Sequence, residues 1–92
     1  MVQTLKSYNP IQQWKTREVK VDSNGYVLVK VPEHPKSFRG GWYYEHRLVA
    51  EKHLNRLLKN YETIHHINET KSDNREINLF VCNREEHNKA HS

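Results

Sequence analysis

The chain has 92 residues, which suffices for one small domain and leaves no room for a second folded unit or a large enclosed substrate cavity. Lys and Arg number 15 against 11 Asp and Glu, so the formal net charge is +4 and a polyanion such as nucleic acid is the favoured partner. Only 35% of the residues are hydrophobic, whereas seven are histidine. A core this thin often needs additional stabilisation, and a bound metal ion is one source of it.

Cysteine content and hydropathy narrow the class of protein further. Cys82 is the single cysteine of the sequence, which excludes an intramolecular disulfide and a zinc site built from paired cysteines. No window approaches the about 20 apolar residues of a membrane span, and residues 1–10 lack the apolar stretch of a secretory signal. We therefore expect a cytoplasmic protein that does not bind a membrane.

The first third of the chain predicts an arm followed by a β-hairpin. Residues 1–17 show no hydrophobic period and are expected to form an irregular N-terminal arm. Polar and apolar residues then alternate on both sides of Ser23-Asn24-Gly25, which has the composition of a turn. Two prolines end the second strand, and residues 36–41 have the composition of a mobile basic loop.

A long helix is predicted between residues 42 and 58. Six residues there follow the spacing of one helical stripe: His46, Val49, Ala50, His53, Leu54 and Leu57. We expect this stripe to pack on the rest of the domain. For its two histidines, packing or a hydrogen bond is favoured over metal ligation, and His34 carries no signal.

The last third predicts the order strand, loop, strand, helix. Residues 62–67 and 78–82 suit strands, and the polar stretch 68–76 joins them. Asn83 followed three residues later by Glu86 is a variant of the capping box that opens a helix.

Four histidines fall on this C-terminal scaffold. His65 and His66 are adjacent on a strand, so their side chains point to opposite faces, whereas His87 and His91 share one face of a helix. Three imidazoles of such a set can converge on a divalent metal and leave positions open for water or a phosphate oxygen. The fourth can act as a general base on a water molecule that attacks phosphorus, because imidazole titrates near neutral pH.

Three segments then carry a resemblance to a known family: Ile64-His65-His66-Ile67-Asn68, Asp73-Asn74-Arg75-Glu76-Ile77-Asn78-Leu79 and Arg84-Glu85-Glu86-His87-Asn88-Lys89-Ala90-His91. They resemble the HNH endonucleases, and most of all the small HNH proteins of bacteriophages. The resemblance extends over roughly residues 18 to 91. It implies an α+β fold, namely a small ββα-metal (His-Me finger) domain with an N-terminal β-hairpin and a long helix packed against it. The domain would span 18–92, with the hairpin and helix in 18–58 and the ββα-metal motif in 62–91.

The resemblance also implies a role for each matching residue. His65, His87 and His91 correspond to ligands of one divalent metal ion, for which Mg²⁺, Mn²⁺, Ni²⁺ and Zn²⁺ all remain open. The catalytic residues would be His66, as the general base, and Asn78, which ties down the connecting loop and helps to orient that base. Glu69 departs from the family, whose members usually have Gly there, so the turn after the histidine doublet is expected to differ in shape.

Function follows as an expectation. Arg39, Lys71 and Arg75 are the preferred phosphate contacts, because affinity that does not depend on base sequence comes from neutralising backbone charge. We expect a phage-type enzyme that nicks double-stranded DNA with low sequence selectivity, as a monomer or weak dimer. Two alternatives stay open: a non-catalytic nucleic-acid-binding module stabilised by zinc, and an RNA-cleaving nuclease of the same fold.

Overall fold

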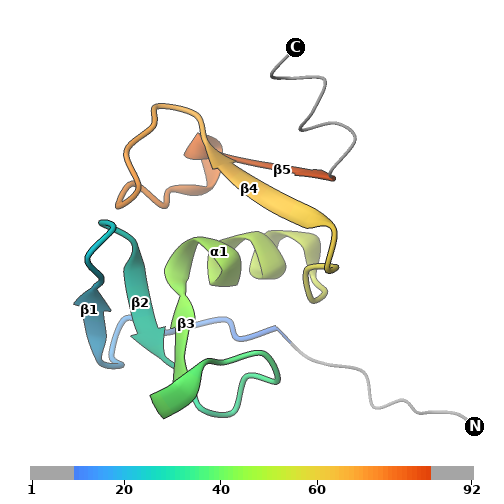
Figure 1. The fold of residues 1–92 in the computed structure, drawn as a ribbon. Coiled ribbons are helices and arrows are strands. Elements are labelled where there is room, and N and C mark those ends of the chain that lie inside the picture. The colour runs from blue at the N-terminus through green and yellow to red at the C-terminus, as the bar shows by residue number, and fades with distance from the viewer. Residues whose placement is uncertain (1–9, 84–92) are drawn as a thin grey trace, which may run out of the picture.

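A computed structural model describes residues 10–83 of the chain. These residues form five strands, one α-helix and two short 3-10 turns: β1 (Val19–Val21), β2 (Val27–Lys30), the turn Arg39–Gly41, β3 (Trp42–Tyr44), α1 (Glu45–Leu54), β4 (Glu62–His66), the turn Glu76–Asn78 and β5 (Leu79–Asn83). β1, β2 and β3 make one antiparallel sheet, and β4 and β5 make a second. α1 lies between the two sheets and contacts both (Figure 1). The predicted α+β class is confirmed.

The predicted hairpin is confirmed as β1 and β2, which pair with Val19 opposite Val29 and Val21 opposite Val27. The side chain of Asp22 fixes the turn between them, because its Oδ1 accepts hydrogen bonds from the backbone N–H groups of Asn24 and Tyr26 at 2.9 and 3.0 Å. This contact is the Asx-type turn that an Asp before Ser-Asn-Gly favours.

The prediction of a helix over 42–58 was wrong at both ends. Trp42–Tyr44 is a strand, β3, because three aromatic residues with high strand propensity pair with β2 in a half-buried sheet. The helix ends at Leu54 because Asn55 adopts the left-handed conformation, with φ of 60°, and donates its backbone N–H to the carbonyl of Glu51. α1 is therefore a helix of ten residues.

The predicted stripe of α1 is also only partly correct. The helix buries His46, Leu48, Ala50 and Glu51. His53 belongs to the predicted stripe, yet 63% of its side chain is exposed, where it pairs with Glu76. The stripe was misplaced because a buried carboxylate, Glu51, shares the inner face, and hydrophobic periodicity cannot identify such a residue. The packing role expected of His46 is confirmed, since it is buried.

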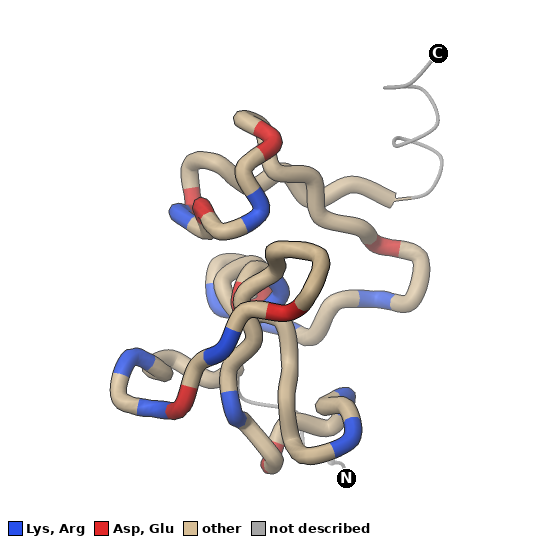
Figure 2. Tube along the Cα trace, turned by 60° about the vertical axis from the view of Figure 1, so that its left-hand side comes forward, with Lys and Arg blue, Asp and Glu red and all other residues tan. Residues whose placement is uncertain are grey.

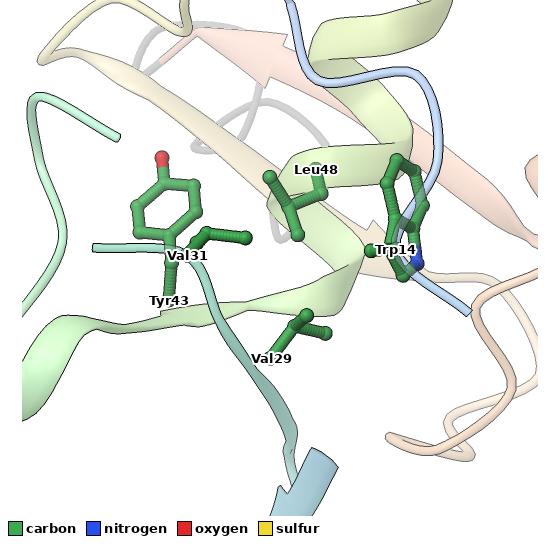
Figure 3. Close-up of a cluster of buried hydrophobic side chains, with 5 residues drawn as sticks. All are labelled: Trp14, Val29, Val31, Tyr43 and Leu48. Atoms are coloured by element: carbon green, nitrogen blue, oxygen red, sulfur yellow. The ribbon is translucent and has the colours of Figure 1, made fainter. Parts of the chain in front are cut away.

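The core lies between α1 and the first sheet. It consists of Trp14, Val29, Val31, Tyr43 and Leu48 (Figure 3). The described part of the segment predicted as an arm has no regular secondary structure, as expected, but it supplies Trp14, which is 9% exposed and belongs to this core. Residues 10–17 therefore pack on the domain, and the boundary at residue 17 stays a prediction.

The second sheet carries the predicted strand pair of the C-terminal motif. β4 and β5 are antiparallel, with His65 opposite Phe80 and His66 opposite Leu79. They begin or end within one residue of the predicted strands 62–67 and 78–82. The helix predicted after Asn83 lies outside the described residues. In residues 10–83 no helix is long and apolar enough to cross a membrane.

Candidate functional site

His65 and His66 lie on opposite faces of β4, as the alternation of a strand requires. His65 is exposed, whereas His66 is 8% exposed and faces the interior of the domain. Leu79 is the partner of His66 across the ladder and comes directly after the turn that contains Asn78. The strand thus places one histidine on the exposed surface and the other in the interior of the domain.

His66 is held by a residue of the loop between β4 and β5. Its Nε2 lies 2.7 Å from Oδ1 of Asn74, which is a short hydrogen bond. The ring of His46 in α1 packs edge-on against it with centroids 5.1 Å apart, and the ring of Tyr26 lies 6.4 Å away. A loop, a helix and the hairpin turn therefore converge on His66.

The contact with Asn74 continues into a chain of hydrogen bonds. Nδ2 of Asn74 donates to Oε1 of Glu45 at 2.8 Å, and Nε1 of Trp14 donates to Oε2 of the same carboxylate at 3.1 Å. Glu45 is the first residue of α1, where a negative charge complements the helix dipole. Sequence reasoning missed Asn74 and Glu45 as site residues. Their partners lie 29 and 31 positions away along the chain, a separation that no local pattern reports.

Asn78 closes the loop between the two strands. Its Oδ1 accepts from the backbone N–H of Asn68 at 3.0 Å, and its Nδ2 donates to Oδ1 of Asn68 at 2.9 Å and to the carbonyl of Asp73 at 2.8 Å. Its backbone carbonyl accepts from Ile67 at 2.8 Å. The loop segment that contains Asn74 is therefore anchored immediately before it reaches His66.

Glu69 occupies the turn after the histidine doublet. Its φ is 64°, in the left-handed region that glycine adopts readily and other residues adopt at a cost. The conformation of this turn therefore suits a glycine, which the family resemblance leads us to expect at this position, although this chain has Glu.

His46 is a second buried imidazole beside His66. It is 7% exposed, and its Nδ1 has no hydrogen-bond partner within residues 10–83. Burial, together with the nearby His66 and Arg47, lowers the pKa of His46 to about 3. His46 is therefore neutral at neutral pH and packs against His66 as an uncharged ring.

Of the three predicted metal ligands, the structure describes only His65. It is exposed at the surface of β4, which suits a group that binds a ligand from outside, and an imidazole is a common ligand of divalent metals. His87 and His91 lie outside the described residues. Within residues 10–83, no group of three or more His, Cys, Asp or Glu side chains is arranged to hold a metal ion.

The three predicted phosphate contacts are not gathered in one place. Arg39 is exposed and begins the 3-10 turn before β3. The segment that leads into β3 lies at the opposite end of the fold from the loop between β4 and β5 (Figure 1). Nζ of Lys71 donates to the carbonyl of Asn24 at 3.0 Å and lies 4.9 Å from the centroid of the Tyr26 ring. Lys71 thereby joins the loop to the hairpin turn on the side where Tyr26 approaches His66.

Arg75, the third predicted contact, is engaged by a neighbour. Its Nε and one terminal nitrogen each donate to a carboxylate oxygen of Asp73 at 2.8 Å, and these bonds lower the pKa of that carboxyl group. Lys and Arg positions are spread over several segments with Asp and Glu between them (Figure 2). Along the described part of the chain, the Lys and Arg positions are therefore interrupted by Asp and Glu positions.

The chain was compared with known proteins. A model of the HNH endonuclease family matches residues 43–89, just over half of the chain. No curated protein and no solved structure matches. The matched range includes both histidines of β4, the loop that holds Asn74 and Asn78, and the position of His87. The chain therefore belongs to the HNH endonuclease family.

Proposed function

We propose that this protein is a metal-dependent DNA endonuclease in which His66 is the general base. HNH endonucleases are nucleases that act on DNA and generally use a divalent metal ion. The observation that carries the proposal is the position of His66: it lies within the matched range, is almost buried, and is held by Asn74 at 2.7 Å. A general base needs a fixed imidazole with one nitrogen available to water.

The proposed reaction is hydrolysis of a phosphodiester. His66 takes one proton from a water molecule as the water oxygen forms a bond to phosphorus. The bond between phosphorus and the 3′ oxygen breaks, and this oxygen takes up a proton from solvent. The products are a 5′ phosphate and a 3′ hydroxyl, as the family resemblance implies.

His65, His87 and His91 would hold the metal ion. When bound, such an ion supplies positive charge that polarises the scissile phosphate and stabilises the leaving oxygen. The exposed position of His65 on β4, on the face opposite to His66, supports this division of roles between the two adjacent histidines.

Asn78 would serve the reaction through the loop. Its three side-chain hydrogen bonds hold Asn68 and Asp73, and Asn74, the residue directly after Asp73, bonds His66. Arg39, Lys71 and Arg75 would neutralise DNA phosphates; Lys71 contacts Tyr26, whose ring lies near that of His66. A single base and a single metal cleave one strand, so a monomer would nick double-stranded DNA with low sequence selectivity. Cleavage of both strands would need a dimer or two successive nicks.

Plasmid nicking tests this function. Supercoiled plasmid is incubated with the wild type, with His66→Ala and with His53→Ala, in Mg²⁺, Mn²⁺, Ni²⁺ or Zn²⁺. We expect the wild type and His53→Ala, which alters an exposed histidine of α1, to convert the plasmid to the open circle. The His66→Ala variant should lose about 10²-fold or more in rate, the contribution of a general base, while it still binds DNA and metal.

Two results would contradict the proposal. Equal inactivity of all three proteins with every metal, with DNA binding retained, would favour the zinc-stabilised binding module. Faster cleavage of RNA than of plasmid would favour an RNA-cleaving nuclease.

A further inference from the structure

Three hydrogen bonds connect Trp14, Glu45, Asn74 and His66, and this chain is here called the relay. In each bond of the relay, chemistry dictates which group donates and which accepts. Both carboxylate oxygens of Glu45 are used, one by the indole N–H of Trp14 and one by the amide of Asn74. A carboxylate can only accept hydrogen bonds, so the group of Asn74 that faces Glu45 is its NH₂. The carbonyl oxygen of Asn74 is then the group that faces His66, at 2.7 Å from Nε2.

The orientation of this amide determines which nitrogen of His66 carries a proton. An amide oxygen can only accept, so Nε2 of His66 must be the donor and must carry its proton. Nδ1 is then the nitrogen with the free electron pair. Within residues 10–83 this nitrogen makes no hydrogen bond, and the His66 residue as a whole is 8% exposed.

We propose that Glu45 and Asn74 are positioning residues that hold His66 in the Nε2–H tautomer and thereby make Nδ1 the atom that takes the proton from water. The inference rests on the proposed function of His66 as general base. Glu45 accepts from the amide of Asn74 and so fixes its orientation, and the carbonyl oxygen of Asn74 then accepts from His66. Trp14 holds the carboxylate of Glu45 from a segment that precedes the matched family range. The relay also borders an open cavity of about 630 Å³, lined in part by Trp14, Glu45 and Asn74.

The variant Glu45→Gln, which changes a carboxylate to an amide, tests whether Glu45 sets the tautomer of His66. In Glu45→Gln the residue at position 45 can donate as well as accept, so the amide of Asn74 can turn over and donate to His66. We expect ¹⁵N NMR of the histidine side chains to show a single Nε2–H tautomer of His66 in the wild type and an added Nδ1–H population in the variant. This measurement needs neither metal nor DNA.

A double variant provides the rescue. In Glu45→Gln with Asn74→Asp, the amide and the carboxylate exchange places: the new carboxylate accepts from Nε2 of His66 and from the new amide. The Nε2–H tautomer is therefore restored without the original residues. With plasmid as substrate, we expect kcat of Glu45→Gln to fall about tenfold with KM nearly unchanged, which is less than the full contribution of a general base. The double variant should recover to within about threefold of the wild type, because the Nε2–H tautomer of the base is restored.

Glu33→Gln is the matched control, because it removes an exposed carboxylate that is paired with Arg17 and lies outside the relay. It should leave both the tautomer and kcat unchanged. An Nδ1–H tautomer in the wild type, an unchanged tautomer in Glu45→Gln, or a double variant no faster than Glu45→Gln would each overturn the inference. If the wild type does not nick DNA at all, the proposed function fails, and the NMR result still decides whether the relay sets the tautomer.

Discussion

Nε2 of His34 lies 2.8 Å from Oε1 of Glu51, and the two side chains are 0% and 1% exposed. The other oxygen of Glu51 accepts from the hydroxyl of Tyr43 at 3.0 Å and from the backbone N–H of Leu58 at 3.3 Å. Burial and the carboxylate of Glu51 raise the pKa of Tyr43, so its hydroxyl keeps its proton and donates. One buried carboxylate thus connects the loop before β3, β3 itself, α1 and the segment that leads to β4.

Replacement of Glu51 by alanine should destabilise the fold strongly. Glu51→Ala leaves the buried polar groups of His34, Tyr43 and Leu58 without their acceptor, and we expect the free energy of unfolding to fall by about 3–5 kcal/mol, the loss typical of breaking a buried pair. Urea denaturation measures this loss. Glu33→Ala, which removes an exposed pair with Arg17, should cost at most about 1 kcal/mol. Equal losses in the two variants would show that the Glu51 contacts do not stabilise the fold.

The sequence predicted those elements whose signals are local. The hairpin follows from alternation around Ser23-Asn24-Gly25, and β4 and β5 follow from two short apolar runs joined by a polar loop. The buried stripe of the helix was misplaced because its inner face includes Glu51, whose carboxylate pairs with His34 at a separation of 17 residues. His34 itself gave no signal, since only the folded chain places it beside Glu51.

In the candidate site, too, the features with local sequence signals were predicted and the long-range contacts were not. The opposite orientations of His65 and His66 follow from strand geometry alone, and the structure has them. Asn78 bonds Asn68 and Asp73 across the loop, and its role in catalysis stays a prediction. Asn74 and Glu45 were not found, because a hydrogen bond between a loop and the start of a distant helix leaves no periodic trace. The predicted ligands His87 and His91 lie outside the described residues and stay predictions.

Two variants of Asn78 test how its side chain holds the loop between β4 and β5. Asn78→Ala removes all three side-chain hydrogen bonds, and we expect the free energy of unfolding to fall by about 1–3 kcal/mol, because these three bonds are made by a buried side chain and are partly shielded from water. Asn78→Asp keeps an oxygen for the N–H of Asn68 and should retain the slow hydrogen exchange of that amide. If the amide of Asn68 exchanges equally fast in both variants, the side-chain oxygen of Asn78 does not protect it.

His46 should make stability depend on pH. Its pKa is lowered to about 3 in the fold, mainly by burial, whereas an unfolded histidine titrates near 6.5. Between these values the unfolded chain binds a proton that the folded chain does not, so stability is complete above pH 6.5 and falls as the pH drops toward 3. The contribution of His46 to the slope approaches about 1.4 kcal/mol per pH unit.

The variant His46→Phe checks this pH dependence, because it keeps a buried ring that cannot bind a proton. Urea denaturation at pH 4, 5, 6, 7 and 8 should give the variant a flatter profile than the wild type below pH 6.5, with parallel profiles above it. Parallel profiles over the whole range would show that His46 does not supply the slope.

Lys71 should contribute to DNA binding through charge alone. Its ammonium group is anchored at the hairpin turn by Asn24 and the Tyr26 ring, and it is exposed. If it neutralises one phosphate, Lys71→Ala should reduce the slope of log Kd against log salt concentration by about 0.9, since one fewer counterion is released. Fluorescence anisotropy with a labelled duplex at several salt concentrations measures the slope, and Lys71→Arg, which keeps the charge, should retain it. A Lys71→Ala slope equal to that of the wild type would place Lys71 outside the DNA interface.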